Sequence, residues 1–359
     1  MEFLIRKTLF AYRAFLHFLF NKKNIAIMKP GVKCSVSQFD YELNKGDIVH
    51  PCIRYAEKKF KGYNWWLIYT PYYNANADLE NPILCYGTSE TDEAPLTWTV
   101  YSEISGKPVT GYNSDPTMFF DEDKLNVFWR ENATPRTQRD SLHRATYGCV
   151  ISETDRCDIE NPVLCEKSDF EDKEVSPAIV KLNGAFNAYA MHMRFSNPKL
   201  HSSNTFINKT TKLLLRVFSI LEIYSEQKSY GIAIWKSNSL NEPFAYYKTT
   251  KIKNSNKLYK PWHLDIFEYE NRLFAVIQTT QCNADICLAV SDDSENFVMY
   301  SKPLITNASI NKLGIYKPTA IIHKGVFYLY YTAQDKDNRS LNLMYLTSMS
   351  FSELQKKLY

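Results

Sequence analysis

The sequence predicts an all-β protein, a five-bladed β-propeller with a short N-terminal helical segment and an insertion between blades 3 and 4. Two observations predict this fold. The composition is rich in aromatic residues, at 14%, and aromatic side chains favour strands. A weak internal repeat also occurs five times along the chain, and such repeats are typical of ring-shaped and stacked folds.

Each copy of the repeat reads as a hairpin of two strands. A short apolar strand begins at or near Pro, a tight polar turn follows, and the second strand is denser in aromatic residues. Pro116, Pro177 and Pro318 each lie seven residues before the turn residue, and Leu264 takes the same place in the fourth copy. We expect each Pro at the first residue of its strand, where the missing N–H removes no ladder hydrogen bond. The copies contain "GDIVHPCIRY", "SDPTMFFDEDKLNVFWRE", "VSPAIVKLNGAFNAYAMHM", "WHLDIFEYENRLFAVIQTT" and "YKPTAIIHKGVFYLYYTAQ".

Each copy also closes in a similar way, as in "ICLAVSDDSENF" and "GIAIWKSNSLNEPF". An alternating strand is followed by Ser and polar turn residues, and usually by an aromatic residue. This pattern predicts a third strand and a short fourth strand, so each copy forms one four-stranded blade. The long interval between the third and fourth copies predicts the insertion, with a helix from Lys209 to Tyr224. A β-sandwich is the alternative, but the aligned register argues against it.

Charge and cysteine content exclude several classes of function. The net charge of +4 comes from scattered Lys residues, so we expect no nucleic-acid partner. The eight Cys form no CxxC pair, and no His pair stands at zinc spacing, so we predict no metal site and no cofactor. Buried, reduced thiols favour a reducing, cytoplasmic compartment.

Residues 1–30 form a separate basic, amphipathic segment, and residues 31–359 form the propeller domain. Arg6, Lys7 and Arg13 interrupt the apolar run, so it resembles neither a secretory signal nor a membrane span. Peripheral membrane contact through residues 1–27 is one interpretation. A helix packed on the protein body, and a true translation start at Met28, are the others.

The residue before each repeat Pro predicts the functional site. In a propeller the innermost strand of each blade lines the axis, so the residues at this position converge. They are unlike one another and mostly ionisable, as a polar substrate requires. Asp265 projects to the same side of its strand as His263. The five converging residues are His50, Asp115, Ser176, His263 and Lys317.

Further polar and aromatic residues are expected at the same rim. Glu174 and Asp47 lie just before the third and first of these positions. The remaining expected substrate-binding residues come from the ends of the second strands and from the rim, where aromatic rings can stack on sugars. They are Arg130, His192, Arg194, Tyr72, Trp262 and Tyr316.

Several of these motifs resemble those of the five-bladed propeller glycoside hydrolases of families 43, 32 and 117. They are "SDP" in the second blade, an acidic residue ahead of the third-blade Pro, "ENP" at Glu80–Pro82 and "SDDSENF" at Ser291–Phe297. The resemblance implies that Asp115 orients the sugar and that Glu174, offset by one residue, is the general acid. Where the family has a general-base Asp, this chain has His50. Asp47 or Asp265 could supply the missing carboxylate.

The sequence therefore predicts a glycoside hydrolase-like protein that cleaves a polysaccharide or oligosaccharide by acid/base chemistry. A glycan-binding propeller without catalysis and a membrane-associated factor in surface polysaccharide biosynthesis are the alternatives. The expected catalytic residues are Asp115, Glu174, Asp265, His50 and His263. The expected substrate-binding residues are Arg130, His192, Arg194, Trp262, Tyr316, Lys317 and Tyr72.

Overall fold

The computed structural model describes residues 26–37, 47–72, 76–104, 111–121, 124–132, 141–148, 160–163, 172–194, 230–240, 242, 244–253, 260–280, 285–310, 314–334 and 342–359. The expected N-terminal helix, the helix from Lys209 to Tyr224 and most of the segment expected at a membrane surface lie outside these ranges. None of the helices in the described ranges has the length and hydropathy of a bilayer-spanning helix.

The described strands form five sheets. The first holds β2 (Ser35–Ser37), β3 (Val49–Phe60), β4 (Tyr63–Thr70), β5 (Ile83–Gly87) and β6 (Thr97–Glu103). The second holds β7 (Tyr112–Asp121), β8 (Lys124–Asn132), β9 (Ser141–Gly148) and β10 (Glu160–Val163). The third holds β11 (Asp172–Leu182), β12 (Ala185–Arg194), β13 (Tyr230–Ser237) and β14 (Ala245–Thr250). The fourth holds β15 (Lys260–Tyr269), β16 (Arg272–Thr280), β17 (Ile286–Ser291) and β18 (Val298–Met299). The fifth holds β19 (Ile315–His323), β20 (Val326–Gln334), β21 (Asn342–Ser350) and β1 (Val32–Lys33).

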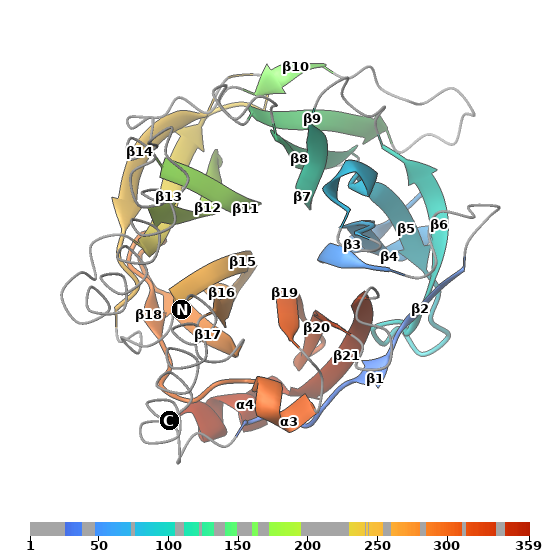
Figure 1. Cartoon of the computed structure of the whole chain (residues 1–359), viewed down its shortest axis with the longest axis vertical. Helices are drawn as coiled ribbons and strands as arrows, with labels where there is room; N and C mark the ends of the chain where they lie inside the picture. Colours follow the sequence, from blue (N-terminus) through green and yellow to red (C-terminus); the bar gives the residue numbers. More distant parts are fainter. Residues whose placement is uncertain are drawn as a thin grey trace, which may run out of the picture.

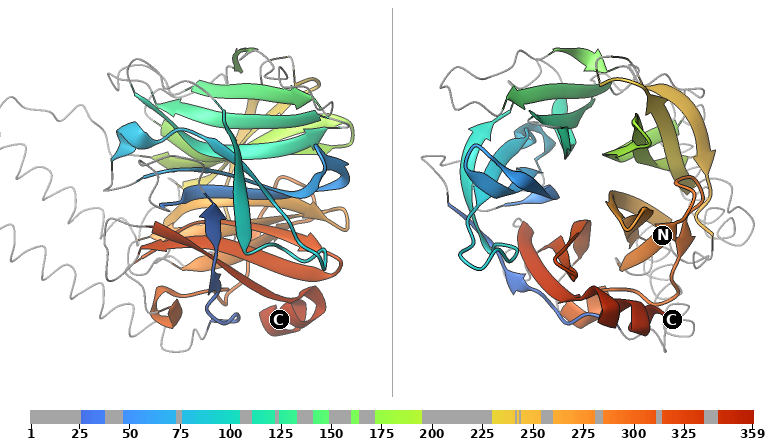
Figure 2. Two further views of the ribbon diagram at one scale, coloured as in Figure 1. Left: turned by 90° about the vertical axis from the view of Figure 1, so that its right-hand side faces the viewer. Right: turned by 180° about the vertical axis from the view of Figure 1, so that it is seen from behind.

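The sheets stand around a common axis in a β-propeller arrangement (Figure 1). The inner strands β3, β7, β11, β15 and β19 contact one another in this cyclic order, and β19 contacts β3. The view from behind shows the same radial order (Figure 2, right). The protein is therefore mostly β, as predicted, and each repeat copy supplies the inner strands of one sheet.

The long interval after the third copy lies at a different place from the one predicted. Residues 195–229 connect β12 to β13, which are neighbours within the third sheet. The expectation of an insertion between blades 3 and 4 is therefore wrong. The segment "GIAIWKSNSLNEPF" closes the third sheet by pairing with β12, so the interval interrupts a sheet and does not separate two of them.

The N-terminal part of the described chain links the fifth sheet to the first. β1 pairs with β21, where Val32 lies opposite Leu346, and β2 runs parallel to β6. Gly31 permits this approach, because a Cβ at this position would lie 2.6 Å from the Leu346 carbonyl oxygen. This closure was not predicted, because strands of two and three residues are too short to show a hydrophobic alternation in the sequence.

The hairpin turns agree with the predicted register. Asn183 and Gly184, between β11 and β12, have φ of 51° and 82°. Lys324 and Gly325, between β19 and β20, have φ of 49° and 74°. Positive φ at both central residues is typical of the type I′ turn, whose twist matches that of the flanking strands.

The prolines do not open their strands, in contrast to the prediction. The ladders shift register between Val49 and Cys52, between Ser114 and Thr117, and between Val175 and Ala178. Each shift spans one X–Pro pair inside the inner strand, so the pair forms a β-bulge. A Pro is tolerated there because the bulge already leaves its position without a ladder partner.

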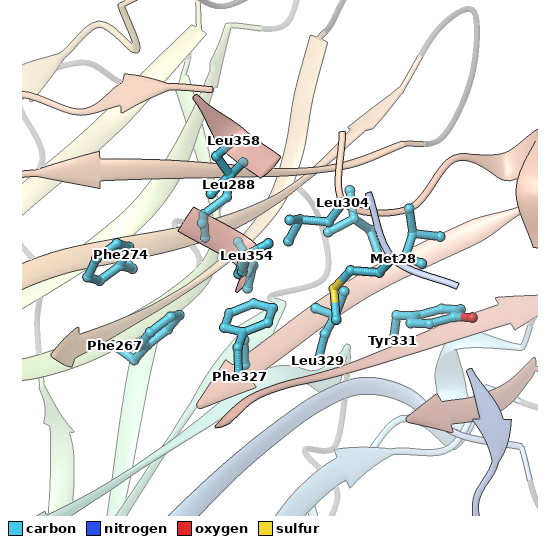
Figure 3. Packing of buried hydrophobic residues seen from close by; sticks show 14 of the residues in the cluster. Met28, Phe267, Phe274, Leu288, Leu304, Phe327, Leu329, Tyr331, Leu354 and Leu358 are labelled. Carbon is cyan, nitrogen blue, oxygen red and sulfur yellow. The ribbon is translucent and has the colours of Figure 1, made fainter. Parts of the chain in front are cut away.

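Apolar clusters fill the spaces between neighbouring sheets. Between the fourth and fifth sheets, Phe267, Phe327 and Leu329 pack against Met28 and against Leu354 of the helix α4 (Phe351–Leu358) (Figure 3). A second helix, α3, spans Asn307–Ile310. Trp65 and Trp66 are buried, and so are the free thiols of Cys34, Cys52, Cys85 and Cys287.

Candidate active site

Buried polar side chains from all five inner strands meet at the axis. Four of the five residues that precede the repeat Pro, or take that place, make direct contacts in this group. We call it the axial cluster, and it consists of His50, Glu80, Asp115, Arg130, Ser176, His263, Tyr316 and Lys317. The central part of the sequence prediction, the convergence of these positions, therefore agrees with the structure.

Backbone geometry directs three of these side chains. His50, Asp115 and Ser176 have φ of 51°, 50° and 56°, and each is followed by Pro in a bulge. Non-Gly residues rarely adopt positive φ, and each such residue costs about 1–3 kcal/mol. The same strained conformation recurs in three sheets, which indicates that the fold maintains it to aim unlike side chains at one place.

Asp115 is the centre of the axial cluster. Its Oδ2 accepts hydrogen bonds from Arg130, with Nη2 at 2.8 Å and Nε at 3.1 Å. Its Oδ1 accepts one from the Ser176 hydroxyl at 3.2 Å and lies 3.5 Å from His263 Nδ1 and 3.6 Å from His50 Nε2. Burial acts to raise the pKa of Asp115, but the charges of His50, Arg130, His263 and Lys317 outweigh it and hold the pKa well below the usual value.

His50 lies between two acidic residues. Its Nε2 faces Asp115 and the Tyr316 hydroxyl, which is 3.3 Å away. Its Nδ1 lies 3.0 Å from Thr70 Oγ1 and 3.2 Å from Glu80 Oε2. Burial raises the pKa of Glu80, against the opposing effect of His50. The two carboxyl groups beside one imidazole are therefore in environments that push their pKa values in opposite directions.

Glu80 was missed as a site residue, although the "ENP" motif that contains it was among those that resemble the propeller glycoside hydrolases. It follows the 3₁₀ helix η2 (Ala77–Leu79), between β4 and β5, and has no place in the repeat register. Only tertiary contacts bring it to the axis. One signal was present in the sequence, namely an acidic residue two positions ahead of Pro82, which is similar to Asp115 directly ahead of Pro116.

His263 and Lys317 are buried basic groups. His263 Nδ1 lies 2.6 Å from the Ser176 hydroxyl, and its Nε2 has no hydrogen-bond partner among the described residues. Burial lowers the pKa of His263 well below its usual value. Burial also lowers the pKa of Lys317, whose ammonium lies 3.4 Å from the Pro116 carbonyl oxygen.

Two of the expected carboxylates, Asp265 and Asp47, accept several hydrogen bonds from neighbouring residues. Asp265 accepts two hydrogen bonds from Arg54, at 2.7 and 2.9 Å, and one from Thr319 at 2.6 Å. Asp47 accepts backbone N–H bonds from Tyr72 and Asn342, each at 2.5 Å. Among the described residues, neither carboxylate forms a hydrogen bond or ion pair with His50, whereas Glu80 Oε2 lies 3.2 Å from His50 Nδ1. Glu80 is therefore the additional acidic group beside His50.

The other expected site residues are Glu174, His192, Trp262, Tyr72 and Arg194. Glu174 and His192 face each other on β11 and β12, with Oε1 and Nδ1 3.0 Å apart. The ring of Trp262 lies 6.0 Å from that of His263. Burial raises the pKa of Tyr72, and the charge of Glu80 acts in the same direction. The backbone of Arg194 ends β12, and its side chain lies outside the described part.

His50, Asp115 and His263 could also hold a divalent cation. One ligand atom from each lies within 4.8 Å of the others, and all three residues are buried. Ligands at about 2.0–2.1 Å around a tetrahedral zinc ion stand about 3.4 Å apart, close to the 3.5 and 3.6 Å that separate Asp115 Oδ1 from the two rings. The sequence analysis looked for closely spaced ligands, whereas these three come from β3, β7 and β15.

No family model and no curated protein sequence matches the chain. Solved structures do match it. An N-acetylgalactosamine deacetylase from F. plautii in complex with blood group B trisaccharide has 14% identity and a TM-score of 0.67, over 92% of this chain and 97% of that one.

Two other structures have a similar likeness. A levansucrase of B. megaterium has 12% identity and a TM-score of 0.61, over 93% of this chain and 92% of that one. A Cellvibrio cellulosa α-L-arabinanase complexed with arabinohexaose has 12% identity and a TM-score of 0.54, over 84% of this chain and 91% of that one. At these identities the likeness shows the propeller fold alone.

Proposed function

We propose that this chain is a carbohydrate-active enzyme that cleaves glycosidic bonds at the axial cluster of a five-bladed propeller. The observation that carries the proposal is His50 between Asp115 and Glu80, two buried carboxyl groups whose pKa values shift in opposite directions. Glycosidic cleavage requires a proton donor and a proton acceptor at one site, and His50, held between these carboxyl groups, can act as the acceptor. Two of the structural neighbours named above are complexes with sugars, one with blood group B trisaccharide and one with arabinohexaose. These complexes support a carbohydrate substrate for this chain.

The chemistry follows from the protonation states. Asp115 stays ionised, so it can stabilise positive charge that develops on the sugar ring. His50 presents Nε2 at the same place and can accept a proton from water. The proposed proton donor is Glu174, through its resemblance to the general acid of family 43.

A leaving-group test separates the proton donor from a structural carboxylate. Glu174→Gln is expected to lower cleavage of unactivated oligosaccharides about 10²- to 10³-fold, because the departing oxygen loses its proton donor. Aryl glycosides with a highly acidic phenol need little protonation, so their cleavage should fall far less. New reducing ends and released phenol are measured across a panel of glycans.

Glu353→Gln is the matched control, because Glu353 lies on α4 and pairs with Lys357 at the surface. Equal losses on both substrate classes would contradict the role of Glu174 as the acid. If the wild-type protein releases reducing ends from no member of the panel, the glycosidase proposal is wrong.

A second candidate function is removal of an acetyl group from an N-acetylated sugar with the help of a divalent cation. The grouping of His50, Asp115 and His263 favours it, and the F. plautii neighbour is named as a deacetylase. A divalent cation supplies Lewis-acid polarisation and activation of water. The three side chains would hold the ion.

Metal removal tests this second candidate. Purified protein is expected to carry about one divalent ion per chain, and His263→Ala to carry much less, as measured by inductively coupled plasma mass spectrometry. A chelator should abolish acetate release from N-acetylated oligosaccharides in the wild type. Metal-free wild-type protein that keeps its activity and does not bind added Zn²⁺ or Mn²⁺ would rule this candidate out.

A further inference from the structure

We propose that Glu80 is the positioning residue of His50, holding the imidazole so that Nε2 faces Asp115. Glu80 thereby supplies, from behind the ring, the carboxylate that the first repeat lacks at position 50. The inference rests on the proposed function, in which His50 moves a proton at Nε2. Pairs of this type, a carboxylate behind an imidazole, fix both the tautomer and the orientation of the ring.

The hydrogen bonds around the ring define one tautomer. Thr70 Oγ1 donates to Glu80 Oε2 at 3.4 Å, so its oxygen is free to accept a bond from His50 Nδ1 at 3.0 Å. Glu80 Oε2 lies 3.2 Å from the same Nδ1, so both neighbours of this nitrogen are oxygens. The proton therefore sits on Nδ1.

The opposite side of the ring agrees with this assignment. The Tyr316 hydroxyl lies 3.3 Å from His50 Nε2, and its oxygen also forms a hydrogen bond with Trp262. Burial raises the pKa of Tyr316 well above its usual value, so the hydroxyl keeps its proton and donates to Nε2. Nε2 therefore carries no proton and accepts the Tyr316 hydrogen bond, and Asp115 Oδ1 lies 3.6 Å from it.

The backbone of Glu80 is fixed to the same frame as Asp115. Its N–H donates to the Ala77 carbonyl at 2.9 Å, and its carbonyl accepts from the N–H of Asn113 at 3.3 Å. Asn113 lies two residues before Asp115 on β7, and its side chain also donates to Asn81 at 2.9 Å. The two acidic groups that flank His50 are therefore held at a fixed separation.

The burial of Glu80 also supports its role as the positioning residue of His50. Only 4% of the surface of Glu80 is exposed, and its Oε2 faces His50 Nδ1 and the Thr70 hydroxyl. A buried carboxylate is costly unless it is paired and hydrogen-bonded. Its principal polar neighbour is an imidazole that itself faces a second carboxylate, which is the arrangement expected for a residue that acts through His50.

The first experiment measures the protonation of the His50 ring directly and needs no substrate. Protein labelled with ¹⁵N at His is compared as wild type, Glu80→Ala and Glu80→Gln, and His50→Ala assigns the signals. We expect the wild-type His50 to be protonated at Nδ1, Glu80→Ala to shift or broaden both ring signals, and Glu80→Gln to restore most of the pattern through its amide oxygen. Identical His50 signals in wild type and Glu80→Ala would overturn the proposal.

The second experiment measures kcat and KM on a glycan that the wild-type protein cleaves. Glu80→Ala should lower kcat about 10- to 100-fold with little change in KM, the range seen for carboxylates that orient a functional His. Glu80→Gln should recover part of the loss. Glu103→Gln is the matched control, since Glu103 accepts a hydrogen bond from Asn81 at 2.5 Å but is not part of the axial cluster.

A double variant shows whether Glu80 acts through His50. Adding Glu80→Ala to His50→Ala should cause almost no further loss, because the orienting group has nothing left to orient. Full additivity would overturn the proposal. If the wild type cleaves no glycan, the proposed function fails, while the expected ¹⁵N pattern would still support the positioning of His50 by Glu80.

Discussion

Asp265→Ala is expected to lower the free energy of unfolding by roughly 3–5 kcal/mol, the range for removing one partner of a buried ion pair. Asp265 is only 2% exposed and forms two hydrogen bonds with Arg54 and one with Thr319. These residues belong to β15, β3 and β19, so one carboxylate ties the fourth, first and fifth sheets together at the axis. Its removal leaves the buried guanidinium of Arg54 without a counter-charge.

Equilibrium unfolding in urea measures this effect, and two comparisons sharpen it. Asp292→Ala removes an exposed carboxylate that pairs with Arg272 at 2.6 Å, and should cost at most about 1 kcal/mol. The double variant Arg54→Met with Asp265→Leu should recover much of the stability, because apolar groups of similar volume often replace a buried pair without loss. A similar, small loss in Asp265→Ala and Asp292→Ala would contradict the structural role of Asp265.

The same pair predicts a pH dependence. Burial acts to raise the pKa of Asp265, but Arg54 and Thr319 hold it below the usual value. A carboxyl whose folded pKa is lowered contributes stability that is complete above its unfolded pKa, about 3.9, and is lost as the pH falls through the folded pKa. The stability difference between wild type and Asp265→Ala should therefore be full at neutral pH and shrink below about pH 4.

The repeat made much of the fold predictable, because its information is local. A Pro, a turn seven residues later and an alternating return strand recur in each copy, so the sheet order and the convergence at the axis followed from the sequence. The prolines were misplaced by a few residues, because a bulge inside a strand and the start of a strand look alike when only the missing N–H is considered.

Other contacts depend on residues distant in sequence, and the sequence shows no sign of them. Glu80 reaches the axis from a connection between β4 and β5, outside the repeat register. Asp265 shares a strand face with His263, so the alternation rule placed both in the site. Whether such a carboxylate is available or occupied depends on Arg54, which lies 211 residues earlier in the sequence. Periodicity gives the direction of a side chain but does not identify its partner.

Asp115→Asn is expected to lower glycan turnover about 10³-fold while the fold is kept. Asn has nearly the same shape and can still accept a hydrogen bond from Arg130 or Ser176, so the packing of the axial cluster changes little. The negative charge between His50 and His263 is lost, however, and the developing cation on the sugar ring loses its nearest counter-charge. Asp121→Asn is the matched control, because Asp121 ends the same strand and pairs with Lys181 at 2.7 Å. kcat/KM is measured for both variants alongside thermal unfolding. A folded Asp115→Asn protein with wild-type turnover would show that the charge at the axis does not take part in the reaction.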